Sequence, residues 1–161
     1  MEPIDVSFTV NGEDYKLSVE PHRLLVHTLR EECGLTGTNI GCESTLCGAC
    51  TIHVNGTSVK SCTMLTVQAD GDDIRTVEGL ASETDLHPIQ QHFQQEHGLQ
   101  CGYCTPGILM NATAYLKEHP DPDRDEIRNL LKGNICRCTG YQNIVNAIEG
   151  YAESMQTTDT E

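Results

Sequence analysis

The chain of 161 residues contains no tryptophan and only two phenylalanines, and aromatic residues make up 4% of it. Lobes with so few large apolar side chains bury modest apolar area, so metal ligation or disulfides become attractive as further sources of stability. The longest apolar stretches, such as LLV and GILM, fall far short of the ~20 residues that a membrane span needs. The length allows one ordinary domain or two small ones.

Basic residues are also scarce, with 10 Lys and Arg against 24 Asp and Glu and a net charge of −14. Such a surface repels phosphates and argues against nucleic-acid binding. It fits a salt-loving host, with an ordinary acidic surface as the alternative. The opening MEPIDVSFTV has neither the basic nor the apolar segment of a secretory signal, so we expect a cytoplasmic protein. Because a reducing cytosol disfavours disulfides, metal or redox chemistry gains weight.

Residues 1–77 show the pattern of a small α+β domain. Asn-Gly pairs at 11–12 and 55–56 each separate two alternating runs, which is a strong hairpin signal. Between the hairpins, residues 24–33 have apolar positions suited to a short helix, and Gly34 follows as a cap. We therefore expect strands paired around one helix.

Residues 85–155 show helical patterns instead. Four short segments begin with capping or acidic residues, one of them with Thr105 as a cap followed by Pro106, and they predict a four-helix bundle. Residues 78–84 form the expected linker, and residues 156–161 are expected to be a frayed tail.

Nine cysteines are present, and the first four have a recognisable spacing. The run C-x4-C-x2-C, followed twelve residues later by a fourth cysteine, is the plant-type ferredoxin spacing for a [2Fe–2S] cluster. Its members are Cys42, Cys47, Cys50 and Cys62. Gly41 and Gly48 would let backbone N–H groups approach the sulfurs. A zinc site or a set of packed structural thiols are the alternatives.

Four more cysteines form two close pairs, in QCGYCTPG and NICRCTG; they are Cys101, Cys104, Cys136 and Cys138. Residues i and i+2 of a helix point about 200° apart, so the second pair must lie in a turn. Each pair precedes an expected helix start, Thr105 then Pro106 in one case and Thr139 then Gly140 in the other, where free N–H groups favour an anionic cluster. Zinc remains a rival for this quartet when it is considered alone.

The stretches GCESTLCGACTIHVNG, QCGYCTPG and GNICRCTGYQNIVNAI resemble the iron–sulfur subunit of the molybdenum hydroxylases, the family of xanthine dehydrogenase, aldehyde oxidase and aerobic carbon monoxide dehydrogenase. The likeness covers about residues 4 to 152. It implies a β-grasp, ferredoxin-like domain followed by a four-helix bundle, each with one [2Fe–2S] cluster. Thr45 and Asn39 replace a glycine and a lysine of many relatives, and the first cysteine loop is closer to the carbon monoxide dehydrogenase style.

The resemblance also implies partners and a direction of electron flow. A large subunit would carry molybdopterin and a medium subunit FAD, in a dimer of heterotrimers. The cluster of the helical domain would lie nearer molybdenum and the ferredoxin-domain cluster nearer FAD. Gln100 and Cys138 match positions that contact the pterin in relatives. No catalytic residue is expected on this chain, since substrate oxidation occurs on the large subunit.

Some residues carry no such role. We expect Cys33 to be a small buried thiol, and His87, His92 and His97 to be surface residues rather than metal ligands, because steps of five residues do not share a helix face. Two other functions remain open: a free-standing two-cluster electron carrier, and an interaction module with two structural zinc sites.

Overall fold

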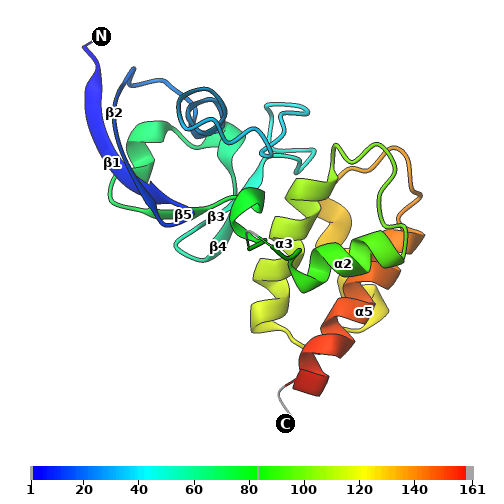
Figure 1. Ribbon diagram of the computed structural model, residues 1–161. Helices are drawn as coiled ribbons and strands as arrows, with labels where there is room; N and C mark the ends of the chain where they lie inside the picture. Colours follow the sequence, from blue (N-terminus) through cyan, green and yellow to red (C-terminus); the bar gives the residue numbers. More distant parts are fainter. Residues whose placement is uncertain (1, 83, 159–161) are drawn as a thin grey trace.

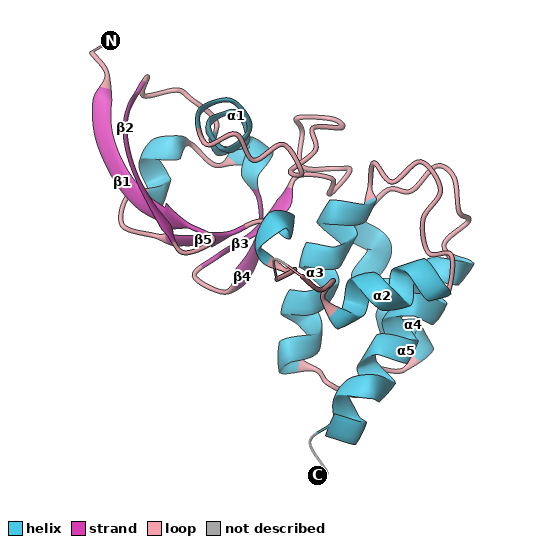
Figure 2. Cartoon of the chain, in the orientation of Figure 1, coloured by secondary structure: helices cyan, strands magenta, loops and turns pink. Residues whose placement is uncertain are grey.

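The computed structural model describes residues 2–82 and 84–158. Two domains lie side by side, one built on a sheet and the other entirely helical (Figure 1). Figure 2 shows the sheet confined to the N-terminal part of the chain and the longer helices to the C-terminal part. The predicted α+β class and the order of its two domains are thus confirmed.

The sheet contains five strands in the order β2-β1-β5-β3-β4. They are β1 (Ile4–Val10), β2 (Glu13–Val19), β3 (Thr51–Val54), β4 (Thr57–Lys60) and β5 (Asp73–Arg75). The central pair, β1 and β5, is parallel, and every other pair in this order is antiparallel. A mixed sheet with the first and last strands parallel at its centre is the predicted β-grasp arrangement.

Both predicted hairpins form. Asn11 and Gly12 have φ values of 53° and 85°, and Asn55 and Gly56 have values of 50° and 83°. The turn that matches the twist of a two-residue hairpin needs positive φ at both central positions, which Asn and Gly tolerate best. The second hairpin places β3 at the position from which it reaches both the first cysteine loop and the helical domain.

The predicted helix at 24–33 also forms, in two parts. It consists of α1 (Leu25–His27) and a π-helical turn (Thr28–Glu32), and Gly34 follows with φ of 72°. The wider turn is closed by the Cys33 N–H, which donates to the Thr28 carbonyl at 3.0 Å. Leu25 and Leu29 are fully buried against the sheet.

The helical domain contains α2 (Pro88–Gln95), α3 (Thr105–Glu118), α4 (Arg124–Leu130) and α5 (Gln142–Thr158). Apolar side chains from all four helices meet in one core that includes Ile89, Phe93, Ile108, Ile127 and Ile144. Their repeat at helical spacing is what the sequence pattern predicted, so the four-helix bundle is confirmed.

Three expected boundaries were wrong. Cys104, not Thr105, is the residue before the first turn of α3, since the Ile108 N–H donates to the Cys104 carbonyl. α5 begins at Gln142, because the Thr139 hydroxyl accepts from the Tyr141 N–H in a turn that precedes the helix.

The frayed tail expected at 156–161 is also corrected, since α5 continues through Thr158. The Gln156 side chain donates to the Asp121 carboxylate at 2.8 Å, which holds this end of the helix against the chain before α4. Residues 159–161 of that tail, and Glu83 of the expected linker, lie outside the described residues. A 3-10 turn (Val77–Gly79) overlaps the start of the expected linker, and Val77 and Leu80 pack against the helical core.

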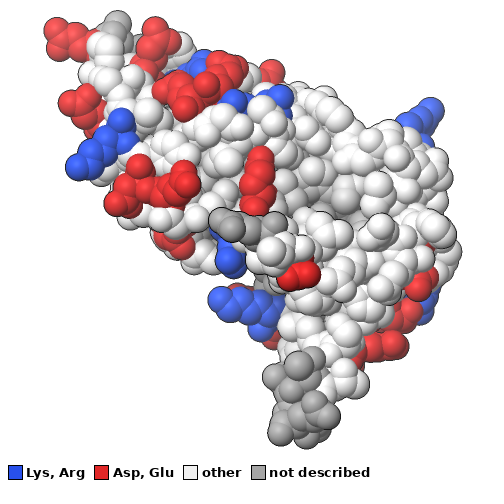
Figure 3. All heavy atoms as spheres, viewed as in Figure 1, with Lys and Arg blue, Asp and Glu red and all other residues white. Residues whose placement is uncertain are grey.

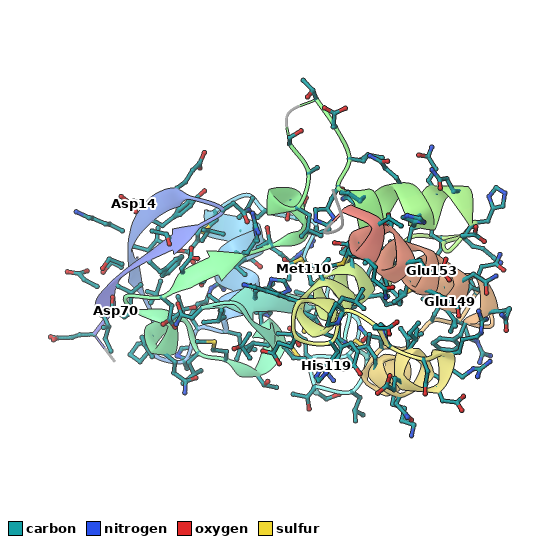
Figure 4. The ribbon with its side chains drawn as sticks, turned by 90° about the horizontal axis from the view of Figure 1, so that it is seen from below. Asp14, Asp70, Met110, His119, Glu149 and Glu153 are labelled. Carbon is teal, nitrogen blue, oxygen red and sulfur yellow. The ribbon has the colours of Figure 1, made fainter. Side chains whose placement is uncertain are left out.

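The two domains meet where α3 packs against β3. In Figure 4 Met110 lies where α3 faces the sheet, and the Met110 carbonyl accepts a hydrogen bond from His53 Nε2 at 2.6 Å. Burial lowers the pKa of His53, so the imidazole is neutral at pH 7 and keeps that proton on Nε2. Among residues 2–82 and 84–158, no helix combines the length and apolar character needed to cross a bilayer.

Candidate metal centres

The first cysteine loop lies between the helical segment of the sheet domain and β3. Cys42, Cys47 and Cys50 lie on it, and Cys62 lies in the 3-10 turn (Ser61–Thr63) that follows β4. Cys50 and Cys62 are 2% and 3% exposed and share a small apolar cluster with Val26. The antiparallel pairing of β3 with β4 therefore brings Cys62 back beside Cys50, although Cys62 comes twelve residues later in the sequence.

Backbone N–H groups surround the exposed end of this loop. The N–H groups of Ser44 and Cys47 donate to Cys42 Sγ at 3.4 and 3.3 Å. Hydrogen bonds from Ser44, and then from Cys47, lower the pKa of the Cys42 thiol to about 6. This curl needs positive φ at Glu43 and Thr45, which have values of 50° and 65°. Donors aimed at sulfur stabilise an anionic ligand, as expected for a cluster loop.

At the buried end of the loop, the thiol pKa is raised and not lowered. Burial raises the pKa of Cys50 to about 11, so without a metal the thiol keeps its proton. Coordination to a cation removes that proton outright, so burial is compatible with ligation. Gly41 is required nearby, because a Cβ there would lie 2.8 Å from Cys47 Sγ.

The second quartet lies in two turns of the helical domain, one before α3 and one before α5. Cys101 Sγ and Cys138 Sγ lie 3.5 Å apart, and the thiols of Cys104 and Cys136 form a second pair. Cys101 and Cys138 are exposed, Cys104 is half-buried and Cys136 is buried. The predicted convergence of QCGYC with NICRC is therefore present, and both members of the C-R-C spacing lie in a turn.

The pairing of thiols is a test of which group fits. No three Cys, His, Asp or Glu residues are grouped closely enough to hold one metal ion anywhere in the described part of the chain. Instead Cys50 packs with Cys62, Cys101 with Cys138 and Cys104 with Cys136. Thiol pairs of this kind fit a [2Fe–2S] cluster, whose two irons divide four cysteine ligands. The donor set fits two-iron clusters.

Hydrogen bonds join the two cysteine sites directly. The Ile135 N–H donates to the Cys47 carbonyl at 2.9 Å, and Asn134 Nδ2 donates to the Gly48 carbonyl at 3.3 Å. The Tyr103 hydroxyl donates to the Ile40 carbonyl at 2.7 Å. Segments that hold the second quartet thus contact the loop that holds the first.

Glycines allow this approach. Gly48 has φ of 72°, and a Cβ there would overlap the Gly133 carbonyl oxygen and Asn134. A Cβ at Gly107, in the first turn of α3, would overlap the Gly48 carbonyl oxygen and lie 2.9 Å from Ala49 Cα. Sequence reasoning missed Gly107, Tyr103 and Asn134. Their only signal is that they stand beside cysteines, which does not reveal that they reach across to another domain.

The remaining predicted residues are placed as follows. Gln100 is exposed, next to Cys101. Cys33 is half-buried against the sheet core, away from the cysteine quartets, and burial raises the pKa of its thiol to about 11. We expected a small buried thiol, and the structure shows one that is half-buried. His87 is not a free surface residue, because it is half-buried and its Nδ1 accepts from the Ile89 N–H at the start of α2.

Comparison with known proteins identifies both halves of the chain. Residues 8–81 match the model of a 2Fe-2S iron-sulfur cluster binding domain, and residues 76–149 match that of a [2Fe-2S] binding domain. The caffeine dehydrogenase subunit gamma of Pseudomonas sp. (strain CBB1) is 50% identical over 159 residues, which cover 97% of this chain and 95% of that protein. The chain belongs to the iron–sulfur small subunits of the molybdenum hydroxylase family.

Other relatives agree with this small-subunit assignment. The nicotine 6-hydroxylase small subunit of Paenarthrobacter nicotinovorans is 46% identical over 145 residues, which cover 90% of this chain and 87% of that protein. A chain of the crystal structure of quinoline 2-oxidoreductase from Pseudomonas putida 86 superimposes with a TM-score of 0.93 at 46% identity, over 98% of both chains. This small subunit is therefore an electron-transfer component of a multi-subunit oxidoreductase and has two [2Fe–2S]-binding domains.

Proposed function

We propose that this small subunit holds one [2Fe–2S] cluster with Cys42, Cys47, Cys50 and Cys62, and a second with Cys101, Cys104, Cys136 and Cys138. The observation that carries the assignment is that thiols of each quartet pack together within two domains that both match [2Fe-2S]-binding models. Each bound cluster would accept and release a single electron at a time. The chain's own contribution is to hold the two sites against one another through Ile135, Asn134 and Gly107.

The partners are proposed from the family. A large subunit with molybdopterin would pass electrons to the cluster of the helical domain, with Cys138 and Gln100 at the pterin, and the sheet-domain cluster would face a medium subunit with FAD. Exposure of Cys138, Gln100 and Cys42 is consistent with partner contacts at both sites. A dimer of such heterotrimers in the cytoplasm is the assembly that we propose.

The substrate of the complex is proposed more coarsely. The names of the relatives above refer to caffeine, nicotine and quinoline, all of which contain a nitrogen heterocycle. We propose that the complex of this subunit oxidises a compound of that class. The predicted likeness of the first loop to the carbon monoxide dehydrogenase style remains a prediction.

Single Cys→Ser substitutions test the ligand assignment. The anaerobically purified wild type should contain about four irons and four sulfides and give two EPR signals when reduced, as two clusters require. Cys101→Ser should remove the signal of the helical-domain cluster, and Cys50→Ser that of the sheet-domain cluster. Cys33→Ser is the matched control and should keep both signals. Zinc in the wild type, or loss of a cluster in Cys33→Ser, would contradict the assignment.

A further inference from the structure

A cavity of about 660 Å³ lies between the two domains, and no cysteine lines it. Its walls come from β3 and β5 on one side and from α3, α5 and the start of α2 on the other. Figure 3 shows Lys and Arg side chains where the two domains meet, and acidic side chains gathered mainly over the sheet domain. The volume is within the range of pockets that hold small molecules.

Basic side chains converge on this cavity from both domains. His53 and Arg75 are cross-strand partners of β3 and β5, so their side chains stand on the same face of the sheet. Lys117 of α3 lines the cavity from the helical side. Burial lowers the pKa of His53, and Arg75 and Lys117 lower it further, as nearby cations do. Cationic groups placed together in this way repel one another.

No described carboxylate forms an ion pair with Arg75 or Lys117. Arg23, Arg124 and Arg128 form ion pairs with carboxylates, but in residues 2–82 and 84–158 neither Arg75 nor Lys117 has a carboxylate at ion-pair distance. Among the described residues that line the cavity Asp73 is the acidic one, and its Oδ1 accepts from the Thr9 hydroxyl at 2.9 Å. In the described part of a chain with a net charge of −14, two cations thus line one cavity without an ion-pair partner.

Neutral donors complete the lining. Because His87 Nδ1 accepts from the Ile89 N–H, a neutral His87 carries its proton on Nε2, where it can donate. Tyr151 lines the same cavity, with its ring centroid 5.7 Å from that of His87. Its hydroxyl donates to no other residue in the described part of the chain. Two charged and two neutral donors therefore come from β5, α3, the residue before α2, and α5.

We propose that this cavity binds an oxyanion, a carboxylate or phosphate group, between Arg75 and Lys117, with His87 and Tyr151 as further donors. A guanidinium binds such a group through two parallel hydrogen bonds, and the ammonium adds a point charge. The oxyanion belongs either to a free small molecule or to an acidic side chain of a partner subunit. Because the cavity lies between the domains, a bound oxyanion would link the two domains across their interface.

Calorimetric titration of the full chain with inorganic phosphate and with citrate, in a Tris chloride buffer of low ionic strength, tests the site. Arg75→Gln combined with Lys117→Gln should weaken binding by at least about tenfold, because two charge-assisted contacts are lost. The control, Lys16→Gln with Arg128→Gln, removes the same charge elsewhere and should bind as the wild type does. Equal weakening in both variants, or no binding by the wild type at millimolar concentrations, would overturn the proposal.

Thermal unfolding without added oxyanion provides a second measurement. At low ionic strength Arg75→Gln should raise the unfolding midpoint, because it relieves repulsion from Lys117 and from any His53 that is protonated. The Lys16→Gln variant should not raise it, since that change increases the net negative charge without relieving repulsion between cations. A midpoint lowered equally by both changes would show that the cations do not repel one another, which contradicts the proposal.

The same titration on the assembled complex distinguishes the source of the oxyanion. Binding by both the chain and the complex supports a free small molecule. Binding by the chain alone supports the site and assigns its occupant to a carboxylate of a partner subunit. Absence of binding in both preparations overturns the site.

Discussion

Gly107 determines how closely α3 approaches the first cysteine loop. A Cβ at this position would overlap the Gly48 carbonyl oxygen, which belongs to backbone and cannot rotate away as a flexible side chain can. Gly107→Ala should therefore lower the free energy of unfolding by about 1–3 kcal/mol, the usual cost of overpacking a tight site. Chemical denaturation monitored by circular dichroism measures the change.

Gly133→Ala is the matched control for this prediction. Gly133 lies in the same domain, but a Cβ there would meet only Lys60 Nζ, at 3.6 Å, which is ordinary contact. Its stability should stay close to that of the wild type. A Gly107→Ala protein as stable as Gly133→Ala would show that the domains separate easily at this point.

Some residues of the candidate site could be identified from the sequence, and others could not. The two cysteine quartets could be singled out because their spacings are distinct and typical of cluster ligands. Gly107 could not, since a glycine in the first turn of a helix reads as a weak helix former and nothing local indicates the carbonyl oxygen opposite. Its role depends on how two domains dock, which is a property of tertiary structure.

Among the elements, the connection between α4 and α5 takes part in both cysteine sites. It leaves α4 as a 3-10 turn (Leu131–Gly133), contacts the first cysteine loop through Asn134 and Ile135, and then presents Cys136 and Cys138. Asn134 is 3% exposed, and its Oδ1 accepts from Asn111 Nδ2 at 2.7 Å. One short segment therefore supports both sites.

Asn134→Ala should destabilise this segment. Removing the side chain leaves the buried Gly48 carbonyl without this donor and Asn111 without this acceptor, at a cost of about 1–3 kcal/mol in the free energy of unfolding. Hydrogen exchange of the Ile135 amide should become faster, because the hydrogen bond from Ile135 to the Cys47 carbonyl loses the support of the adjacent Asn134–Gly48 hydrogen bond. Asn129→Ala, at an exposed position of α4, should change neither quantity. Equal exchange rates in the two variants would argue against the supporting role.

Elements with strong local signals were predictable, and their ends were less so. The Asn-Gly hairpins and the four helices follow from local backbone preference and apolar spacing. The start of α5 was misplaced because Thr139 looked like a cap, yet its hydroxyl interacts with Cys136 Sγ at 3.1 Å and accepts from the Tyr141 N–H. Thr139 therefore closes a local turn between Cys136 and Tyr141, and the helix begins only after it.

At the scale of the whole molecule, the dominant feature is the net charge of −14. Repulsion between like charges destabilises a compact state, and salt screens it as the Debye length falls from about 10 Å at 0.1 M to about 3 Å at 1 M. The unfolding midpoint should therefore rise as sodium chloride is increased over this range, in a differential scanning calorimetry series. This response would also favour the salt-loving host over an ordinary acidic surface.

Charge variants separate screening from a general effect of salt. Asp14→Asn combined with Glu153→Gln removes two exposed carboxylates, one from each domain (Figure 4), and should reduce the rise of the midpoint with salt. A midpoint that falls with salt, or a rise of the same size in this variant, would show that self-repulsion does not govern stability.

The contact of α3 and of the Asn134 segment with the first loop also affects how this subunit would acquire its cluster. Cys50 and Cys62 are almost completely enclosed, and the helical domain covers the loop at Gly48. If these cysteines are ligands as proposed, iron and sulfide reach them only when the loop opens, because Leu24, Val26 and Ile40 of the same domain pack around them. We therefore expect the docked helical domain to slow the opening of this loop and the loading of its cluster.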